Sequence, residues 1–513
     1  MSSHFRQKLL PPVGFLAFLV WGLIFALAYA QSPLYASNQN QYFLHGLTHA
    51  GYGDLWRDWL ANTLDPTPVF SALVAMIYSG LGWEGWFYII YALLMGIYLY
   101  SLWGIVDAVF ELHASQMKTI LFFSLLILLS SAGWRFTLSR VLGVNWAYVL
   151  EDGVADQRLL GPVLQPSAFG VFLLLSIYFY LRGRPYLGVA AAVIAATFHP
   201  TYLLSSAALT FVYIWDAFFN RRNLRMAAQL GLLALALVSP ILLVSYTVFA
   251  GAPAQAAQQA RQILIEFRIP HHAVVSQWFD ITAVVKISIV CIAITLTRRT
   301  RLFTVLLIPA LISVALTLAQ LALASDTLAL LFPWRLSTFL VPLSTAIILA
   351  AIVQRVPSFR WARAEIGQKA LVVASILFIA LSLLVGIIRF TLDLDRKGHE
   401  SEQPLMEFVS INRSPGDTYV IPLKMQDFRL DTGAAVLVDF KAIPYRAEEV
   451  LEWYHRVQLV EQFEKNGDCA ALSRILGEYP VTHVVIEAGQ GGGTCAQLEP
   501  VYSDASYNLL RVK

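Results

Sequence analysis

The sequence predicts a polytopic α-helical membrane protein that ends in an α/β domain, and three observations predict it. Of the 513 residues, 58% are hydrophobic and only 13% are charged, about half the charged fraction of an average soluble protein. Runs of about twenty apolar residues recur between Leu10 and Phe390, as membrane-spanning helices require. After Leu392 the composition changes to short strand-like segments separated by polar turns.

The apolar runs predict about eleven membrane-spanning helices. The predicted spans are 11–30, 84–106, 119–132, 163–181, 187–200, 201–219, 227–250, 276–297, 302–322, 331–353 and 370–391. The first run is too long for a removable signal peptide and lacks a small-residue cleavage site, so we expect a retained helix. The run Val69–Gly80 has only about a dozen residues, where a span needs about 17–25, and predicts a re-entrant or interfacial helix.

The positions of the basic residues predict the orientation, because cytoplasmic loops are enriched in Lys and Arg. With the N-terminus in the cytoplasm, the inner connections hold Arg6, Lys8, Lys118, Arg182, Arg184, Arg221, Arg222, Arg225, Arg298, Arg299, Arg301, Arg355, Arg360, Arg363 and Lys369. Counting Val69–Gly80 as a full span would move "RGR", "RRNLR" and "RRTR" to the outside. We therefore expect outer loops at about 31–68, 133–162, 251–275 and 323–330.

The C-terminal tail is also expected outside, which divides the chain into a transmembrane domain, 1–391, and an extracytoplasmic α/β domain, 392–513. Its strand-like runs are "TYVIPL", "AVLVDF", "VTHVVIEAG" and "YNLLRV", and a helix is expected at about 446–465. Cys469 and Cys495 both lie in this domain, on the oxidising side of the membrane. We expect them to form a disulfide, with two free thiols as the alternative.

The stretch "GDLWRDWL" in the first outer loop places two acids four residues apart, Asp54 and Asp58. On a helix they would share one face, where they could hold a divalent cation such as Mg or Mn, or where one could act as a base. The alternative is a solvated face with one acid paired to Arg57. We expect the loop to form short helices on the membrane surface, with three aromatic side chains at headgroup level: Tyr52, Trp56 and Trp59.

Further polar residues are expected at the same face of the membrane. In "EDGVADQRLLGP", Asp152 and Asp156 come just before Arg158, an arrangement that suits a metal or the hydroxyls of a substrate, or a simple solvated connection. His199 lies at an outer hairpin. Arg335 lies one turn into a span at its outer end, where it should be paired or face a cavity, or else extend to the headgroups. Phosphate is an anion that Arg recognises well.

The arrangement of a first span, an acidic outer loop with surface helices, many further spans and an outer α/β domain resembles the GT-C class of membrane glycosyltransferases. This resemblance covers the whole chain as architecture and rests, at the motif level, on the acids of "GDLWRDWL". It implies transfer of a sugar from a polyprenyl-phosphate carrier to an acceptor, with inversion at the anomeric carbon. Asp58 or Asp54 would be the general base, and Arg335 or Arg158 would hold the carrier phosphate.

The expected substrate-binding set is completed by Asp152, Asp156, His199 and Trp59. In the family the acids are often adjacent and near the start of the loop, whereas here they come about two dozen residues after the span. The expected partners are a polyprenyl-phosphate-linked sugar and the lipid bilayer, with no nucleic acid, in the inner membrane of a bacterium.

Two other functions remain open from the sequence. One is a multi-pass transporter or lipid flippase, for which Lys286, near the middle of a predicted span, is the main ionisable residue. The other is a non-catalytic subunit for envelope assembly, whose outer domain binds a partner. Charges at the outer surface should control an enzyme, whereas charge at the membrane midplane should control a carrier.

Overall fold

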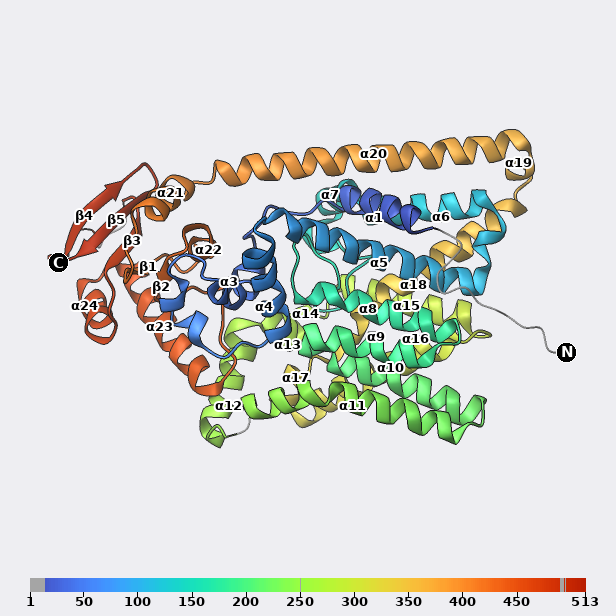
Figure 1. Cartoon of the computed structure of the whole chain (residues 1–513), viewed down its shortest axis with the longest axis horizontal. Helices are drawn as coiled ribbons and strands as arrows, with labels where there is room; N and C mark the ends of the chain where they lie inside the picture. The colour runs from blue at the N-terminus through green and yellow to red at the C-terminus, as the bar shows by residue number, and fades with distance from the viewer. Residues whose placement is uncertain (1–13, 250, 490–492, 494) are drawn as a thin grey trace.

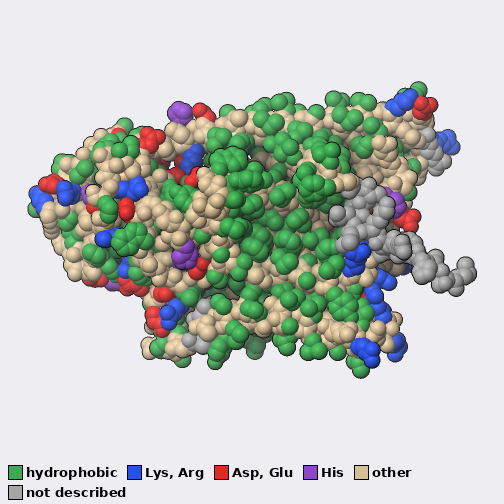
Figure 2. Space-filling view, viewed as in Figure 1, with side chains coloured by type: hydrophobic (Ala, Val, Ile, Leu, Met, Phe, Trp, Pro, Cys, Tyr) green, Lys and Arg blue, Asp and Glu red, His purple; other side chains and the backbone are tan. Residues whose placement is uncertain are grey.

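The computed structural model describes residues 14–249, 251–489, 493 and 495–513. It is an elongated bundle of helices with a small sheet at its C-terminal end (Figure 1). Hydrophobic side chains cover the middle of the face shown in Figure 2, and charged side chains gather toward its two ends. A bilayer favours this distribution, because charged side chains are costly in hydrocarbon. The chain is a membrane protein.

Every apolar run that the sequence assigns to a span contains a helix. These helices are α1 (Phe15–Tyr29), α5 (Gly85–Phe110), α6 (Gln116–Leu129), α8 (Val171–Leu181), α9 (Pro185–Phe198), α10 (Leu203–Trp215), α11 (Leu224–Phe249), α15 (Ile281–Thr297), α16 (Leu302–Leu323), α18 (Ser337–Arg355) and α20 (Glu365–Gly398). The start of the first predicted span, with Arg6 and Lys8 before it, lies outside the described residues.

Length and composition separate these helices into two groups. Within the described residues, six helices are long and apolar enough to cross a membrane, or seven if α6 and α7 (Ala132–Leu142), which meet at 52°, form one span. The helices at α1, α8, α9 and α15 are apolar but shorter, at 10–17 residues. The total of about eleven spans therefore stays a prediction.

The connections contain shorter helices. They are α2 (Gln39–Tyr42), α3 (Leu44–His49), α4 (Pro68–Ala75), α12 (Ala254–Gln262), α13 (Pro270–Ala273), α14 (Val275–Trp278), α17 (Asp326–Leu330) and α19 (Arg360–Arg363). The helix predicted at Val69–Gly80 is present as α4, and a turn of π-helix, Met76–Gly80, continues it.

The C-terminal part is an α/β unit, as the sequence predicts. Its helices are α21 (Gln403–Asn412), α22 (Phe428–Thr432), α23 (Ala447–Asn466) and α24 (Cys469–Glu478). Its strands are β1 (Thr418–Val420), β2 (Ala435–Val436), β3 (His483–Glu487), β4 (Leu498–Ser503) and β5 (Tyr507–Val512), in the sheet order β2-β1-β3-β5-β4. β1 pairs with β2 and β3 in parallel, and β5 pairs with β3 and β4 antiparallel.

Four of these strands and α23 lie in the predicted segments, whereas β4 was not predicted. β4 is an edge strand whose side chains are mostly exposed, so it lacks the apolar run that marks the others. The predicted disulfide between Cys469 and Cys495 is confirmed, and it links the start of α24 to the segment that precedes β4.

Candidate functional site

A cavity of about 1040 Å³ lies where the helices, the outer loops and the C-terminal part meet. Residues far apart in the sequence line it, within the segments 37–42, 65–69, 144–167, 197–204, 237–245, 264–272, 330–335 and 441–445. Five of the predicted site residues are among them: Asp152, Asp156, Arg158, His199 and Arg335.

The loop that carries Asp152, Asp156 and Arg158 is held by two helices. From α15, the ammonium of Lys286 donates a 2.9 Å hydrogen bond to the carbonyl of Gly153. From α18, the Ser337 hydroxyl accepts the amide of Val154 at 2.7 Å, and Thr345 donates to the carbonyl of Leu150 at 2.8 Å. Lys286 is thus buried as an anchor for the acidic loop.

Asp152 and Arg158 form an ion pair on the cavity wall. Nη2 of Arg158 lies 3.3 Å from Oδ2 of Asp152, and the guanidinium lies 4.2 Å from the ring centroid of Tyr148. Burial raises the pKa of Asp152 to about 6, and the charges of Arg158 and Lys286 act against this rise. The Oδ1 atom of Asp152 has no hydrogen-bond partner among the described residues.

Arg335 and His199 form a second polar group. Nη1 of Arg335 donates to Nε2 of His199 at 3.2 Å, so the imidazole accepts and its Nδ1 carries the proton. The guanidinium also lies 5.6 Å from the ring centroid of Tyr202. His272 is close by, and its Nδ1 donates to the carbonyl of Ala155 at 2.7 Å. Burial, followed by the charge of His271, lowers the pKa of His272 to about 3.

Buried polar atoms without a partner are concentrated on this wall. A buried polar group that makes no hydrogen bond costs about 1–3 kcal/mol, so such atoms are uncommon in native proteins. Among the described residues, the following atoms of cavity-lining residues have none: Oδ1 of Asp152, both amide atoms of Gln157, Oγ of Ser167, Nδ1 of His199, Oγ1 of Thr201, Nε of Arg268 and Nε of Arg335. Because these atoms have almost no accessible surface, small side-chain movements are needed before they can bond to a ligand in the cavity.

The other wall of the cavity is apolar. It comes from α10, α11 and the segment before Arg335, through Leu203, Leu204, Leu237, Pro240, Ile241, Val244, Leu330, Leu331 and Phe332. α11 is weakly packed, because only 11% of its apolar 18-residue segment is buried inside the protein. An apolar wall beside a loosely covered membrane helix suits the hydrocarbon chain of a lipid.

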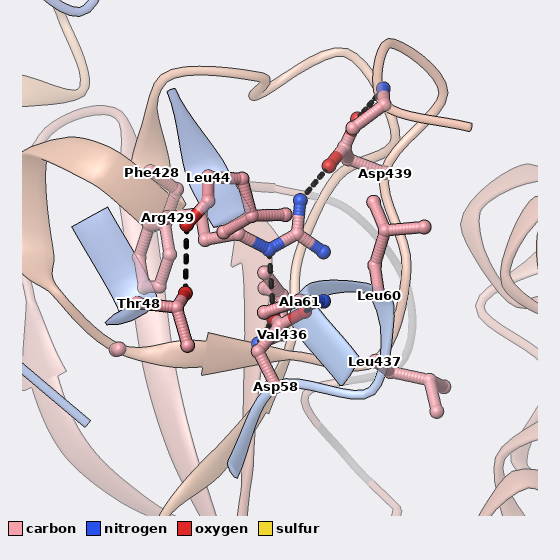
Figure 3. Close-up of polar contacts among 12 residues, drawn as sticks. Leu44, Thr48, Asp58, Leu60, Ala61, Phe428, Arg429, Val436, Leu437 and Asp439 are labelled. Atoms are coloured by element: carbon pink, nitrogen blue, oxygen red, sulfur yellow. Dashed lines mark hydrogen bonds and ion pairs between the residues drawn. The ribbon is translucent and has the colours of Figure 1, made fainter. Parts of the chain in front are cut away.

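Asp58 and Asp54 do not line the cavity. Asp58 is 0% exposed, and its carboxylate accepts hydrogen bonds from Nε of Arg429 at 2.7 Å and from the amides of Val436 at 2.9 Å and Ala61 at 3.1 Å. Figure 3 shows Arg429 between Asp58 and Asp439, its second carboxylate partner. We therefore assign neither acid a role as base in the cavity.

The expected shared face of these two acids is wrong, because the segment is not an α-helix. A single 3-10 turn, Leu55–Arg57, follows Asp54, and Asp58 then has an extended backbone. Asp54 is paired with Arg413 at 3.2 Å rather than with Arg57, and its amide donates to the carbonyl of Gly433 at 2.8 Å.

The position of Trp59 and Tyr52 relative to the lipid headgroups stays a prediction, and both side chains are half-buried in contacts within the protein. The guanidinium carbon of Arg456 lies 4.0 Å from the ring centroid of Trp59. Trp59 does not line the cavity. The Tyr52 hydroxyl donates to the carbonyl of Leu430 at 2.6 Å. The first outer loop therefore packs against the C-terminal part.

The lining also contains polar residues that the predicted site lacks, among them Asp65, Gln157, Arg268 and Lys441. Asp65 lies just before α4, and its Oδ1 accepts the amide of Thr67 at 2.8 Å. Arg268 had a local signal, since it lies in an outer loop two residues before Pro270 and the His271–His272 pair. Lys441 had none, because its position follows from the packing of the C-terminal part.

A divalent cation remains a prediction. Within the described ranges, no group of three or more His, Cys, Asp or Glu side chains could hold a metal ion. Asp152 is also engaged by Arg158, which competes with a cation for the same carboxylate.

Comparisons with known proteins give a short family match and a distant structural likeness. Residues 400–460 match a family model described as a domain of unknown function (DUF6798). No curated protein matches the chain. Among solved structures, the crystal structure of ArnT from Cupriavidus metallidurans bound to undecaprenyl phosphate is similar, with 11% sequence identity, a TM-score of 0.48 and 97% of each chain covered. At this distance the likeness carries no functional conclusion, which has to come from the cavity.

Proposed function

We propose that the protein is a membrane glycosyltransferase that takes a sugar from a polyprenyl-phosphate carrier and passes it to an acceptor in the cavity. One observation carries this proposal. An apolar wall beside a loosely packed membrane helix meets a wall of buried polar atoms that have no protein partner. A lipid with a phosphorylated sugar headgroup matches both walls.

Arg335 is the proposed ligand of the carrier phosphate. Its Nε is buried and has no hydrogen-bond partner in the described chain, and its Nη1 donates to a neutral His199. A guanidinium binds phosphate through charge-assisted hydrogen bonds, which are about twice as strong as neutral ones. The positive charge would also stabilise the phosphate as it leaves.

Asp65 is the proposed general base, in the role that the family resemblance gives to an aspartate of the first outer loop. One carboxylate oxygen is held by the amide of Thr67, and no described residue donates to the other. The base takes the proton of the acceptor hydroxyl, and that oxygen attacks the anomeric carbon from the face opposite the phosphate. The bond from this carbon to the phosphate oxygen breaks, and its electron pair leaves with the phosphate, so the anomeric centre inverts.

The transporter alternative gains no support from Lys286, because the ammonium of this residue is bonded to the backbone of the acidic loop. The remaining elements of the proposal are the inner membrane of a bacterium, a cytoplasmic N-terminus and chemistry at the outer face.

Native mass spectrometry of the detergent-purified protein with added polyprenyl phosphate tests the proposal. We expect wild type and Asp65→Asn to retain the lipid, because Asp65 acts on the acceptor, and Arg335→Gln to lose it. Arg57→Gln is the matched control, because Arg57 belongs to the outer loops and does not line the cavity. If no form of the protein retains the lipid, the glycosyltransferase proposal is wrong.

A further inference from the structure

Two basic residues at the end of the cavity nearest the C-terminal part take no role in the transfer proposed above. Arg268 ends a π-helical turn, Ile263–Arg268, and Lys441 follows β2. Nη2 of Arg268 donates to the carbonyl of Lys441 at 2.6 Å, which fixes the two residues side by side. The Nε of Arg268 is buried and has no hydrogen-bond partner among the described residues.

These two cations lack a counter-ion. In the described part of the chain, no carboxylate lies within 4.0 Å of either one. Asp439 is the acid whose charge acts most strongly on Arg268, but it is bonded to Arg429. Burial, and then the charge of Arg268, lowers the pKa of Lys441, and the same two causes lower the pKa of His271. Like charges that are partly buried together are unfavourable, and a bound anion would relieve this.

This basic pair is separate from Arg335. Tyr42 is near both groups: its ring meets the ring of His199 edge-on at 5.9 Å, and the charges of both Arg335 and Arg268 oppose the burial that raises its pKa. On the side of the C-terminal part, Gln41 donates to the hydroxyl of Tyr445 at 3.0 Å. The cavity therefore has one cationic group beside the apolar wall and another beside the C-terminal part.

We propose that Arg268 and Lys441 form a second anion subsite, which binds a phosphate monoester group of the acceptor. This inference rests on the proposed function, because it assigns the two cationic groups to the two substrates of one transfer. The Arg fork and the Lys ammonium together can satisfy several oxygens of one phosphate. The phosphate can belong to a lipid headgroup or to a water-soluble ester, and the experiment separates these sources.

The test measures the binding of two probes to purified full-length protein by native mass spectrometry. Both probes are phosphate monoesters: the first is polyprenyl phosphate, whose long isoprenoid chain suits the apolar wall, and the second is dioctanoyl phosphatidic acid, whose acyl chains are short. Two variants are compared with wild type. One is the paired Gln variant, which carries Arg268→Gln and Lys441→Gln together, and the other is Arg335→Gln alone. Lys424→Gln is the matched control, because Lys424 is an exposed lysine of the C-terminal part that does not line the cavity.

The paired Gln variant should bind phosphatidic acid about tenfold more weakly and keep polyprenyl phosphate, because it loses charge-assisted hydrogen bonds to the second subsite alone. Arg335→Gln should show the reverse. The conservative pair Arg268→Lys with Lys441→Arg should recover most of the phosphatidic acid binding, which separates loss of charge from loss of folding.

The two proposals fail in different ways. If wild type binds no polyprenyl phosphate, the proposed function fails. If polyprenyl phosphate binding depends on Arg335 but the paired Gln variant still binds phosphatidic acid like Lys424→Gln, the second subsite is wrong. Glycerol 3-phosphate serves as the water-soluble probe. Binding of this ester that depends on the same pair would support the subsite and assign it a soluble acceptor, whereas a requirement for phosphatidic acid would assign it a lipid.

Discussion

At the residue scale, the surroundings of each charged side chain decide whether it holds the fold together or faces the cavity. Arg429 is 1% exposed and bridges two buried carboxylates, Asp58 and Asp439, so each acid has a cationic partner inside the protein. Arg335 and Arg268 are only partly buried, line the cavity and form no ion pair with a carboxylate among the described residues. The first arrangement is structural, and the second suits an anionic ligand.

Replacing Arg429 by Met should strongly destabilise the protein. The substitution leaves Asp58 and Asp439 buried without their shared cation, and breaking a buried ion pair typically costs about 3–5 kcal/mol. Thermal unfolding in detergent measures the effect. Arg413→Met is the matched control: it breaks the half-exposed pair with Asp54, which should contribute at most about 1 kcal/mol. Equal shifts for the two variants would contradict a structural role for Arg429.

Asp152 should make stability depend on pH. Its pKa is raised from 3.8 to about 6, so the folded protein holds this proton more tightly than the unfolded chain does. The resulting stabilisation is complete below about pH 4 and is lost as the pH rises past about 6. In Asp152→Asn this contribution is absent, so the melting temperature of wild type relative to the variant should fall between pH 4 and pH 7.5. Parallel melting curves across this range would contradict the assignment.

Sequence reasoning located the arginines and acids of the second loop better than those of the first. Asp152, Asp156 and Arg158 lie within a few residues of one another, next to a span, and local spacing alone brings them together. Asp58 is bonded to Arg429, which lies 371 positions away in the sequence. No local sequence pattern predicts such a contact. Asp54 and Asp58 would share one face only on an α-helix, whereas a single 3-10 turn separates them in the structure.

At the scale of elements, the loop between α7 and α8 owes its position to α15 and α18. Lys286→Met removes the ammonium that holds the carbonyl of Gly153 and should destabilise the protein by about 1.5–3 kcal/mol, the range for hydrogen bonds to charged groups. Because the loop also carries Arg158 and Asp152, we expect weaker retention of polyprenyl phosphate. Melting temperature and native mass spectrometry measure the two effects.

The control for this variant is Lys118→Met, which changes a lysine that contacts Gln354 near the ends of α6 and α18 predicted to be cytoplasmic. It should leave both melting temperature and lipid retention close to wild type. If Lys286→Met behaves like Lys118→Met, the anchor is unimportant and an intramembrane role for Lys286 returns.

Helices were predictable from the sequence because the bilayer imposes a simple rule on length and polarity. All predicted spans contain helices, since an apolar run in hydrocarbon must satisfy its backbone internally. β4 was missed because an exposed edge strand such as Leu498–Ser503 has no apolar alternation to mark it. The short helices of the first loop were expected, but their packing partner was not.

At the scale of the whole molecule, contacts between distant segments constrain the topology. The first outer loop is bonded to the C-terminal part through Asp58 and Arg429, Asp54 and Arg413, and Asn40 and Asp427. Both segments must therefore lie on one side of the membrane, and the chain between them must cross it an even number of times. With ten predicted spans between them this holds, whereas counting α4 as a span would give eleven and separate the partners.

We therefore expect α4 to return to the side from which it starts, and a labelling experiment can test this. Ser79→Cys and Asn220→Cys place single thiols at exposed positions, after α4 and before α11, in a Cys291→Ser background that removes the free cysteine. A membrane-impermeant thiol reagent added to intact cells with a permeable outer membrane should label position 79 and spare position 220. Breaking the inner membrane should expose position 220. Labelling of position 79 only after that step would mean that Val69–Gly80 crosses the bilayer, and the contacts between the first loop and the C-terminal part could then not form in the membrane.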